Sequence, residues 1–314
     1  MKLSKGMQLG AMLAAMLLVS VVFVPAVSAQ ESNGRISPDA VDKATVDERT
    51  PSFIKELRNK GFSEAEIAKA ILNLSTKYQD GWTDEDNKRV VGNFKKVQEG
   101  LKNNTLQSTG TQSYVQKNGA MVIDETNYRG VNGYVRPSSM EVSSSGTQIQ
   151  YVTSHLGAAG TWIEVGVARF YWNPNEYVVY TVDSTQPSDQ QWKTWGIANP
   201  NIDNNFETYV HDFNDGQGYP YYIAWNGIVI RTGHVPFAAG NPSEDHEYFA
   251  ASASSFTPVS LSYFKESYLY RGNTALWWNG YLPETTHYWG DLPVRVNRYI
   301  PSGSNAYKID SWIP

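Results

Sequence analysis

The chain of 314 residues contains no cysteine. It therefore has no disulfide framework, no thiolate metal site and no cysteine nucleophile. The G-x-S-x-G signature of serine hydrolases and a phosphate-binding loop are absent as well. Five histidines are scattered along the chain without an H-E-x-x-H motif or an i, i+4 pair. We therefore expect no metal ion and no other cofactor.

An excess of positive charge is also missing. The chain has 26 Lys and Arg against 31 Asp and Glu, a formal net charge of -5. A nucleic-acid partner is not expected for such a balance.

Only the N-terminal segment contains an apolar run that approaches the length of a membrane span. Lys2 and Lys5 precede an apolar run over 7–24, and small residues end at Ala29. This order predicts a signal peptide over 1–29, and an uncleaved anchor is the alternative. We expect a protein that is secreted or exported to the cell surface, with no membrane partner after cleavage.

Residues 30–113 predict a polar tether, a small helical unit and a linker. Ser63 and Glu66 have the spacing of a capping box, and Ile67 and Ile71 follow on one helical face. A second helix is predicted over 83–101, and 103–113 has no apolar period. In an exported protein this unit is interpreted as a propeptide, with a permanent accessory domain as the alternative.

From residue 114 to 314 the apolar pattern changes to period two. The chain has 10 Trp and 20 Tyr, most of them in this part, and turn signals recur. Asp215-Gly216 and Asn226-Gly227 each separate two short β runs, which predicts hairpins. Many short strands without helices between them predict a mainly β fold, an antiparallel β-sandwich of jelly-roll or concanavalin-like type.

One predicted strand carries a carboxylate among apolar residues. In the run TWIEVGV, alternation places Trp162, Glu164 and Gly166 on one face and the aliphatic residues on the other. A charge is costly to bury unless it is paired or protonated. Glu164 is therefore a candidate cleft residue, or else a carboxylate on the wet side of a sheet.

A second strand, SEDHEYFA, offers a partner. Alternation places Asp245, Glu247 and Phe249 on one face. Two carboxyls that are close together in a partly dry cleft do not both ionise easily, so one keeps its proton while the other stays basic. Such a pair can activate water and polarise a carbonyl group.

The W-I-E-V-G-V run, with the later Glu-aromatic strand and the serine-rich stretch after it, resembles the glutamic peptidases, namely the eqolisins and neprosin. In the eqolisins a catalytic Gln lies on an I-L-Q-T-G-V strand and a catalytic Glu on a later strand. The resemblance implies that Glu164 takes the Gln position and Glu247 the Glu position. It also implies a two-sheet sandwich over 114–314 with the pair on a concave face.

Three functions are compatible with these residues. The first is an acid-active endopeptidase in which Glu164 and Glu247 are catalytic, while Trp162, Tyr151 and Asp245 contact an extracellular polypeptide. The second is a non-catalytic module that binds carbohydrate or cell surfaces through aromatic clusters. The third is a glycoside hydrolase, which is ranked last because the usual E-x-D-x-x-E spacing is absent.

Overall fold

The structure is a computed structural model that describes residues 49–102, 115–122, 127–137, 149–170, 172–250, 259–272, 274–279, 285–290 and 295–313. Three helices come first in the chain: α2 (Ser52–Asn59), α3 (Glu64–Leu72) and α4 (Asp84–Lys102). All later elements of the described residues are strands. The predicted signal peptide and the linker over 103–113 lie outside the described residues.

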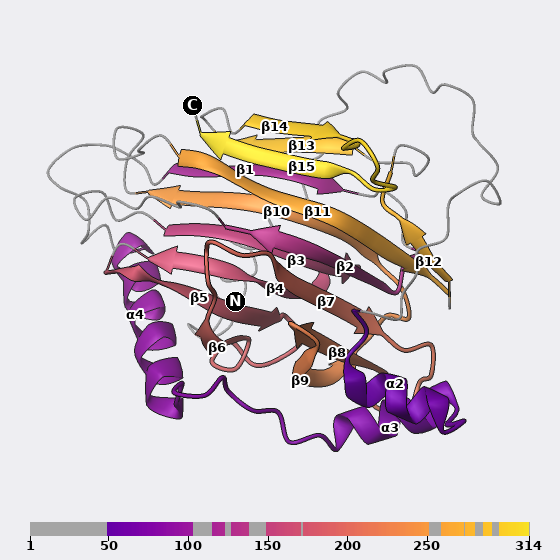
Figure 1. Cartoon of the computed structure of the whole chain (residues 1–314). Helices are drawn as coiled ribbons and strands as arrows, with labels where there is room; N and C mark the ends of the chain where they lie inside the picture. The colour runs from indigo at the N-terminus through magenta and orange to yellow at the C-terminus, as the bar shows by residue number, and fades with distance from the viewer. Residues whose placement is uncertain are drawn as a thin grey trace, which may run out of the picture.

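The strands form two antiparallel sheets that lie one over the other (Figure 1). Sheet B has the order β13-β1-β10-β3-β4-β5-β6 and sheet A the order β14-β15-β11-β2-β7-β8-β9, with β12 paired to β11. Sheet B is built from β1 (Val115–Val122), β3 (Ile149–Ala158), β4 (Thr161–Phe170), β5 (Asn173–Asp183), β6 (Trp192–Ile197), β10 (Asn241–Ala250) and β13 (Thr285–Gly290). Sheet A is built from β2 (Gly130–Arg136), β7 (Asn204–Val210), β8 (Tyr219–Trp225), β9 (Ile228–Val235), β11 (Val259–Arg271), β12 (Thr274–Trp277), β14 (Arg295–Tyr299) and β15 (Lys308–Ile313). The predicted β-sandwich is confirmed.

The main core lies between the two sheets. On β4, Ile163, Val165 and Val167 are fully buried in it, as the alternation of this strand predicts. From the other sheet, Phe206 and Ile223 pack into the same cluster. The opposite side chains of β4, Glu164 among them, therefore belong to the outer face of sheet B.

Both predicted hairpins are present. β7 and β8 pair across Asp215-Gly216, and β8 and β9 pair across Asn226-Gly227. Asn226 and Gly227 both have positive φ angles, 48° and 76°, the conformation that a type I′ turn requires.

Helices α2 and α3 cover the outer face of sheet A. Ser63 and Glu66 form the predicted capping box at the start of α3. Ile54, Ile67 and Ile71 are buried against tyrosines of sheet A. These helices bury their apolar faces on the sandwich, so that their packing depends on it.

Helix α4 covers the outer face of sheet B, and the extended segment between α3 and α4 passes the lower end of the sandwich (Figure 1). This segment satisfies backbone groups of the edge strand β6. The Gln79 backbone N–H donates to the Trp195 carbonyl at 2.9 Å, and the Ile197 N–H donates to Gln79 Oε1 at 2.7 Å. In α4, Asn87 Oδ1 accepts from the Thr194 N–H at 2.8 Å. The helical unit thus covers an exposed sheet edge, which otherwise invites pairing with another chain.

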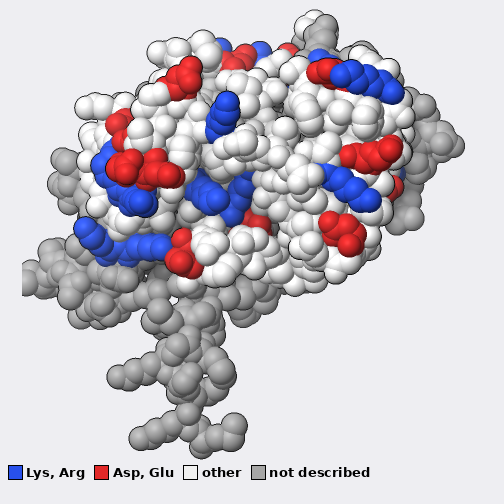
Figure 2. Space-filling model, turned by 90° about the horizontal axis from the view of Figure 1, so that it is seen from below, with Lys and Arg blue, Asp and Glu red and all other residues white. Residues whose placement is uncertain are grey.

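The lower side of the molecule, seen in Figure 2, carries acidic and basic side chains interspersed with one another. Arg58 pairs with Glu64 at 3.1 Å, and Lys60 with Glu56 at 2.6 Å. Within the described part of the chain no helix is long and apolar enough to cross a membrane.

Because the helices pack on the sandwich, we expect one cooperative unfolding transition for the helical unit and the sandwich. Ile67→Ala removes a side chain that is fully buried in this contact. It should lower the free energy of unfolding of the whole chain by about 2–4 kcal/mol. Ile202→Ala, at a side chain that is 49% exposed, is the control and should change stability little. Denaturant unfolding followed by tryptophan fluorescence measures both.

A two-step denaturation curve, in which Ile67→Ala shifts only a first helical step, would contradict this expectation. It would favour the independent helical domain that the sequence also allows. Removal of residues 30–113 as a propeptide stays a prediction.

Candidate active site

Glu164 lies on the outer face of sheet B, half-buried beside Trp162 and Gly166. The Tyr180 hydroxyl, on the neighbouring strand β5, donates a hydrogen bond of 2.5 Å to Glu164 Oε1. A hydrogen bond to a carboxylate stabilises its charged form and fixes its orientation. Tyr180 therefore holds one oxygen of Glu164 in place.

The position of Tyr180 is fixed by aromatic packing that continues to helix α4. Its ring stacks on Trp192 of β6 with the centroids 4.5 Å apart and the planes at 14°. Phe94 of α4 contacts the other end of this group, 4.7 Å from the Trp192 centroid. Tyr180 itself is only 1% exposed. A continuous contact thus runs from α4 to the carboxylate.

Asp245 lies on the same face, two strands from Glu164. On β10 it pairs with Thr153 of β3, and Thr153 pairs with Gly166 of β4. Directly paired residues of an antiparallel sheet point to the same side. Asp245 is therefore in line with Gly166, which lies two residues along β4 from Glu164. Its side chain is buried, and the Ser243 hydroxyl donates to Asp245 Oδ2 at 3.0 Å.

Burial, opposed by the hydrogen bond from Ser243 and assisted by the negative charge of Glu164, raises the pKa of Asp245 to about 8. Asp245 keeps its proton at neutral pH mainly because it is buried, and the negative charge of Glu164 adds to this effect.

His155 completes the row of side chains through Glu164. It pairs with Glu164 on one side and with Ser243 on the other. Burial lowers the pKa of His155 to about 4, so the ring is neutral at physiological pH. Its ring centroid is 6.1 Å from that of Trp162. A neutral imidazole beside the carboxylate adds a hydrogen-bonding group without adding charge.

The neighbour of Asp245 in sequence points to the other side. Glu244 faces the interior of the sandwich, where the Ser267 hydroxyl donates to its Oε1 at 2.5 Å. Burial raises the pKa of Glu244 to about 8. Because Glu244 is enclosed between the sheets, we do not assign it to the outer face.

The other predicted site residues are placed as follows. Trp162 is buried in the cluster that α4 covers. Glu247 pairs with Tyr151 and with Asn118, two residues further along β10 than Asp245. The side chains of Glu247 and Tyr151 lie outside the described residues. A direct contact between Glu164 and Glu247 therefore stays a prediction, as do the substrate contacts of Trp162 and Tyr151.

Tyr180, Ser243 and His155 were missed by the sequence analysis. Tyr180 has a signal in the sequence, because it lies in the aromatic run that follows Glu164 and pairs back onto its strand. His155 is brought to Glu164 by the pairing of β3 with β4, and Ser243 is brought to His155 by the pairing of β10 with β3. Among the described residues no group of three or more His, Cys, Asp or Glu side chains is placed to hold a metal ion.

No family model matches the chain, and no curated protein matches it in sequence. Among solved structures it is weakly similar to scytalido-glutamic peptidase with a transition-state analogue inhibitor, with 9% identity, a TM-score of 0.42 and coverage of 63% of this chain and 98% of that one. A member of the eqolisin family in complex with a tripeptide gives 7% identity, a TM-score of 0.37 and the same coverages.

A transglycosylase in complex with N-acetylglucosamine gives 12% identity and a TM-score of 0.28, over 50% of this chain and 77% of that one. The structural neighbours thus include glutamic peptidases and enzymes that act on glycans. With TM-scores below 0.5, none of these likenesses decides the function, which has to be inferred from the side chains of this chain.

The raised pKa of Asp245 predicts how stability depends on pH. The unfolded chain releases this proton near pH 3.8 and the folded chain near pH 8. The contribution of Asp245 to stability is therefore full below pH 3.8 and is lost as the pH rises to about 8. Asp245→Asn removes the ionisable group and with it this pH-dependent loss of stability. Compared with wild type, the variant should gain stability between pH 4 and pH 8, on the order of a few kcal/mol.

Denaturant melts of wild type, Asp245→Asn and the control Glu85→Gln, at an exposed position of α4, measure this. A constant stability difference between wild type and Asp245→Asn from pH 4 to pH 8 would show that Asp245 is not protonated in the fold.

Proposed function

We propose that the chain is a glutamic-type endopeptidase whose carboxyl pair is Glu164 and Asp245. The observation that carries the proposal is that the two carboxyls share the outer face of sheet B while burial and the charge of Glu164 keep Asp245 protonated. A pair that contains one ionised and one neutral carboxyl has a base and an acid at the same time. No metal ion or nucleophilic side chain is required for hydrolysis by such a pair.

In this mechanism Glu164 is the general base. It takes a proton from a water molecule, whose oxygen attacks the carbonyl carbon of the scissile peptide bond. Asp245 donates its proton to the carbonyl oxygen, which gives a neutral gem-diol. The C–N bond then breaks as protonated Glu164 gives its proton to the leaving amine, while a hydroxyl of the gem-diol returns a proton to Asp245. Both carboxyls end in their starting states.

Tyr180 has a positioning role in this proposal. Its hydrogen bond to Glu164 Oε1 fixes the orientation of the carboxylate that receives the proton from water. The stacking of Tyr180 on Trp192 restrains its ring, and a rigid support is what a reactive carboxylate needs.

A polypeptide substrate is favoured because this face of sheet B already binds a polypeptide, namely the α4 segment of the same chain. Trp82, just before α4, and Val90 and Phe94 of α4 pack on the cluster that contains Trp162 and Tyr180. The backbone of the edge strand β6 also forms hydrogen bonds with the segment before α4. The resemblance of the Glu164 strand to the eqolisin motif agrees with this substrate class.

Substitution of the three acidic residues tests the assignment. Glu164→Gln and Asp245→Asn should each lower the rate of cleavage of unfolded casein by about 10²-fold or more, because each removes one half of the acid–base cycle. Glu247→Gln should keep most of the activity, since Glu247 lies two residues further along β10. In wild type, activity should fall as the pH rises through about 8, where Asp245 loses its proton.

Loss of activity in Glu247→Gln with full activity in Asp245→Asn would instead favour the pair that the eqolisin resemblance implies. Absence of casein cleavage by wild type between pH 3 and pH 8 would contradict the peptidase and leave the binding module. Barley β-glucan is the second substrate in the assay, and cleavage of it but not of casein would favour a glycosidase.

A further inference from the structure

A cavity lies on sheet A, away from Glu164 and Asp245. It has a volume of about 520 Å³, is open to solvent, and is lined by β11, by the end of β12 and by the loop that precedes β15. This volume is within the range of sites that bind small molecules. None of its lining residues takes part in the proposed peptidase site.

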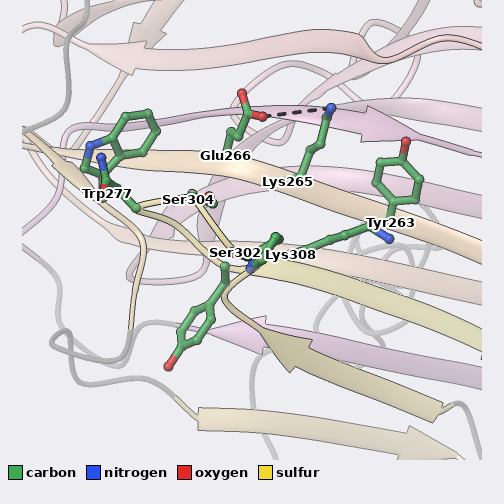
Figure 3. Close-up of a pocket in the computed structure, with 11 residues that line it drawn as sticks. Tyr263, Lys265, Glu266, Trp277, Ser302, Ser304 and Lys308 are labelled. Atoms are coloured by element: carbon green, nitrogen blue, oxygen red, sulfur yellow. Dashed lines mark ion pairs between the residues drawn. The ribbon is translucent and has the colours of Figure 1, made fainter.

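Aromatic rings stand at both ends of this cavity. Figure 3 shows Trp277 at one end and Tyr263 at the other, with Lys265 and Glu266 side by side between them. Trp277 is half-buried and is held edge-on by Tyr268, with the centroids 6.0 Å apart and the planes at 85°. A fixed and partly exposed aromatic ring offers a flat apolar surface to a ligand.

Glu266 reaches the cavity because β11 contains a bulge. Lys265 pairs with Tyr134 and Tyr268 with Asn132, so Glu266 and Ser267 together face one residue of β2. Glu266 has a φ angle of 53°, which is unfavourable for a residue with a side chain. Bulges and such strained residues are found preferentially at functional sites. The bulge turns Ser267 inward to Glu244, while Glu266 stays on the side of the cavity.

The charges of the cavity are largely compensated. Lys265 Nζ is 2.6 Å from Asp203, and Lys308 Nζ is 2.9 Å from Asp310. An anion would therefore find little uncompensated positive charge, whereas each ammonium group keeps further N–H donors. Glu266 Oε2 is bound by Arg49 at 3.2 Å. Its Oε1 is 3.9 Å from Lys265 Nζ, too far for a hydrogen bond, and can accept one from a ligand.

We propose that this cavity binds a neutral pyranose unit of a glycan. A pyranose has apolar C–H faces, which fit the ring of Trp277, and hydroxyl groups, which fit Glu266 Oε1 and the lysine N–H donors. The ring of Tyr263 at the other end is already in contact with Lys308, whose Nζ lies 4.3 Å from its centroid. It carries no charge, in keeping with the compensated lysines. The protein thus has a carbohydrate site on sheet A that is separate from the carboxyl pair on sheet B.

Isothermal titration calorimetry of the full chain with five oligosaccharides tests this proposal. Four probes are neutral, namely cellopentaose, laminaripentaose, maltopentaose and chitopentaose, and pentagalacturonate is the anionic probe. At least one neutral probe should bind. Trp277→Ala should weaken that binding by about tenfold or more, because a ring contact is lost. Trp172→Ala, at a half-buried tryptophan that packs on Phe170 of sheet B, is the matched control and should bind like wild type.

Glu266→Gln tests the same site with a variant of nearly unchanged shape. It should weaken binding of the neutral probe several-fold and should keep the casein activity of wild type. This variant decides the matter if Trp277→Ala does not fold. The proposal is wrong if no neutral probe binds, if pentagalacturonate binds more tightly than every neutral probe, or if Glu266→Gln binds like wild type.

Discussion

The outer face of sheet B accommodates one negative charge more easily than two, and the proposed chemistry depends on this constraint. Asp245 is buried and Glu164 is half-buried, and both belong to neighbouring rows of the same sheet. One ionised and one protonated carboxyl cost less free energy than two ionised carboxylates. A buried carboxylate loses its hydration, and two carboxylates repel each other. Burial and Tyr180 then decide which carboxyl holds which state. Tyr180 supports the charge on Glu164, and the deeper Asp245 keeps the proton.

The aromatic content of the chain follows from the way in which the two outer faces are covered. Each sheet contributes one face to the shared core, and the opposite faces carry Tyr and Trp side chains that pack beneath helices. On sheet A the tyrosines lie under α2 and α3. On sheet B, Phe94, Trp192 and Tyr180 connect α4 with Glu164. In this arrangement a change in the seating of α4 reaches the carboxylate through three rings in contact, without a change in the core between the sheets.

Local sequence patterns were sufficient for much of the fold. Alternation on β4 placed Glu164 opposite the aliphatic core residues, and the Asn226-Gly227 pair predicted its own turn. The capping box at Ser63 located the start of α3. These features depend on residues within a few positions of one another, and the physics that produces them is equally local.

The candidate site required pairings between distant segments, which no local pattern gives. Alternation cannot distinguish Asp245 from Glu247, because a step of two residues on β10 returns to the same face. Only the register of β10 against β3 places Asp245 in line with Gly166. The cavity beside Glu266 depends on a bulge in β11, and its sequence there, Lys265-Glu266-Ser267, contains no glycine that would signal it.

The coupling between Glu164 and Asp245 is measured most directly by a pH titration of the Asp245 side-chain carboxyl carbon by ¹³C NMR, in wild type and in Glu164→Gln. We expect Asp245 to titrate near pH 8 in wild type. In Glu164→Gln its pKa should be lower, because the neighbouring negative charge is gone. An Asp245 that titrates near its ordinary value of about 3.9, or a raised pKa that Glu164→Gln leaves unchanged, would contradict the proposed pair.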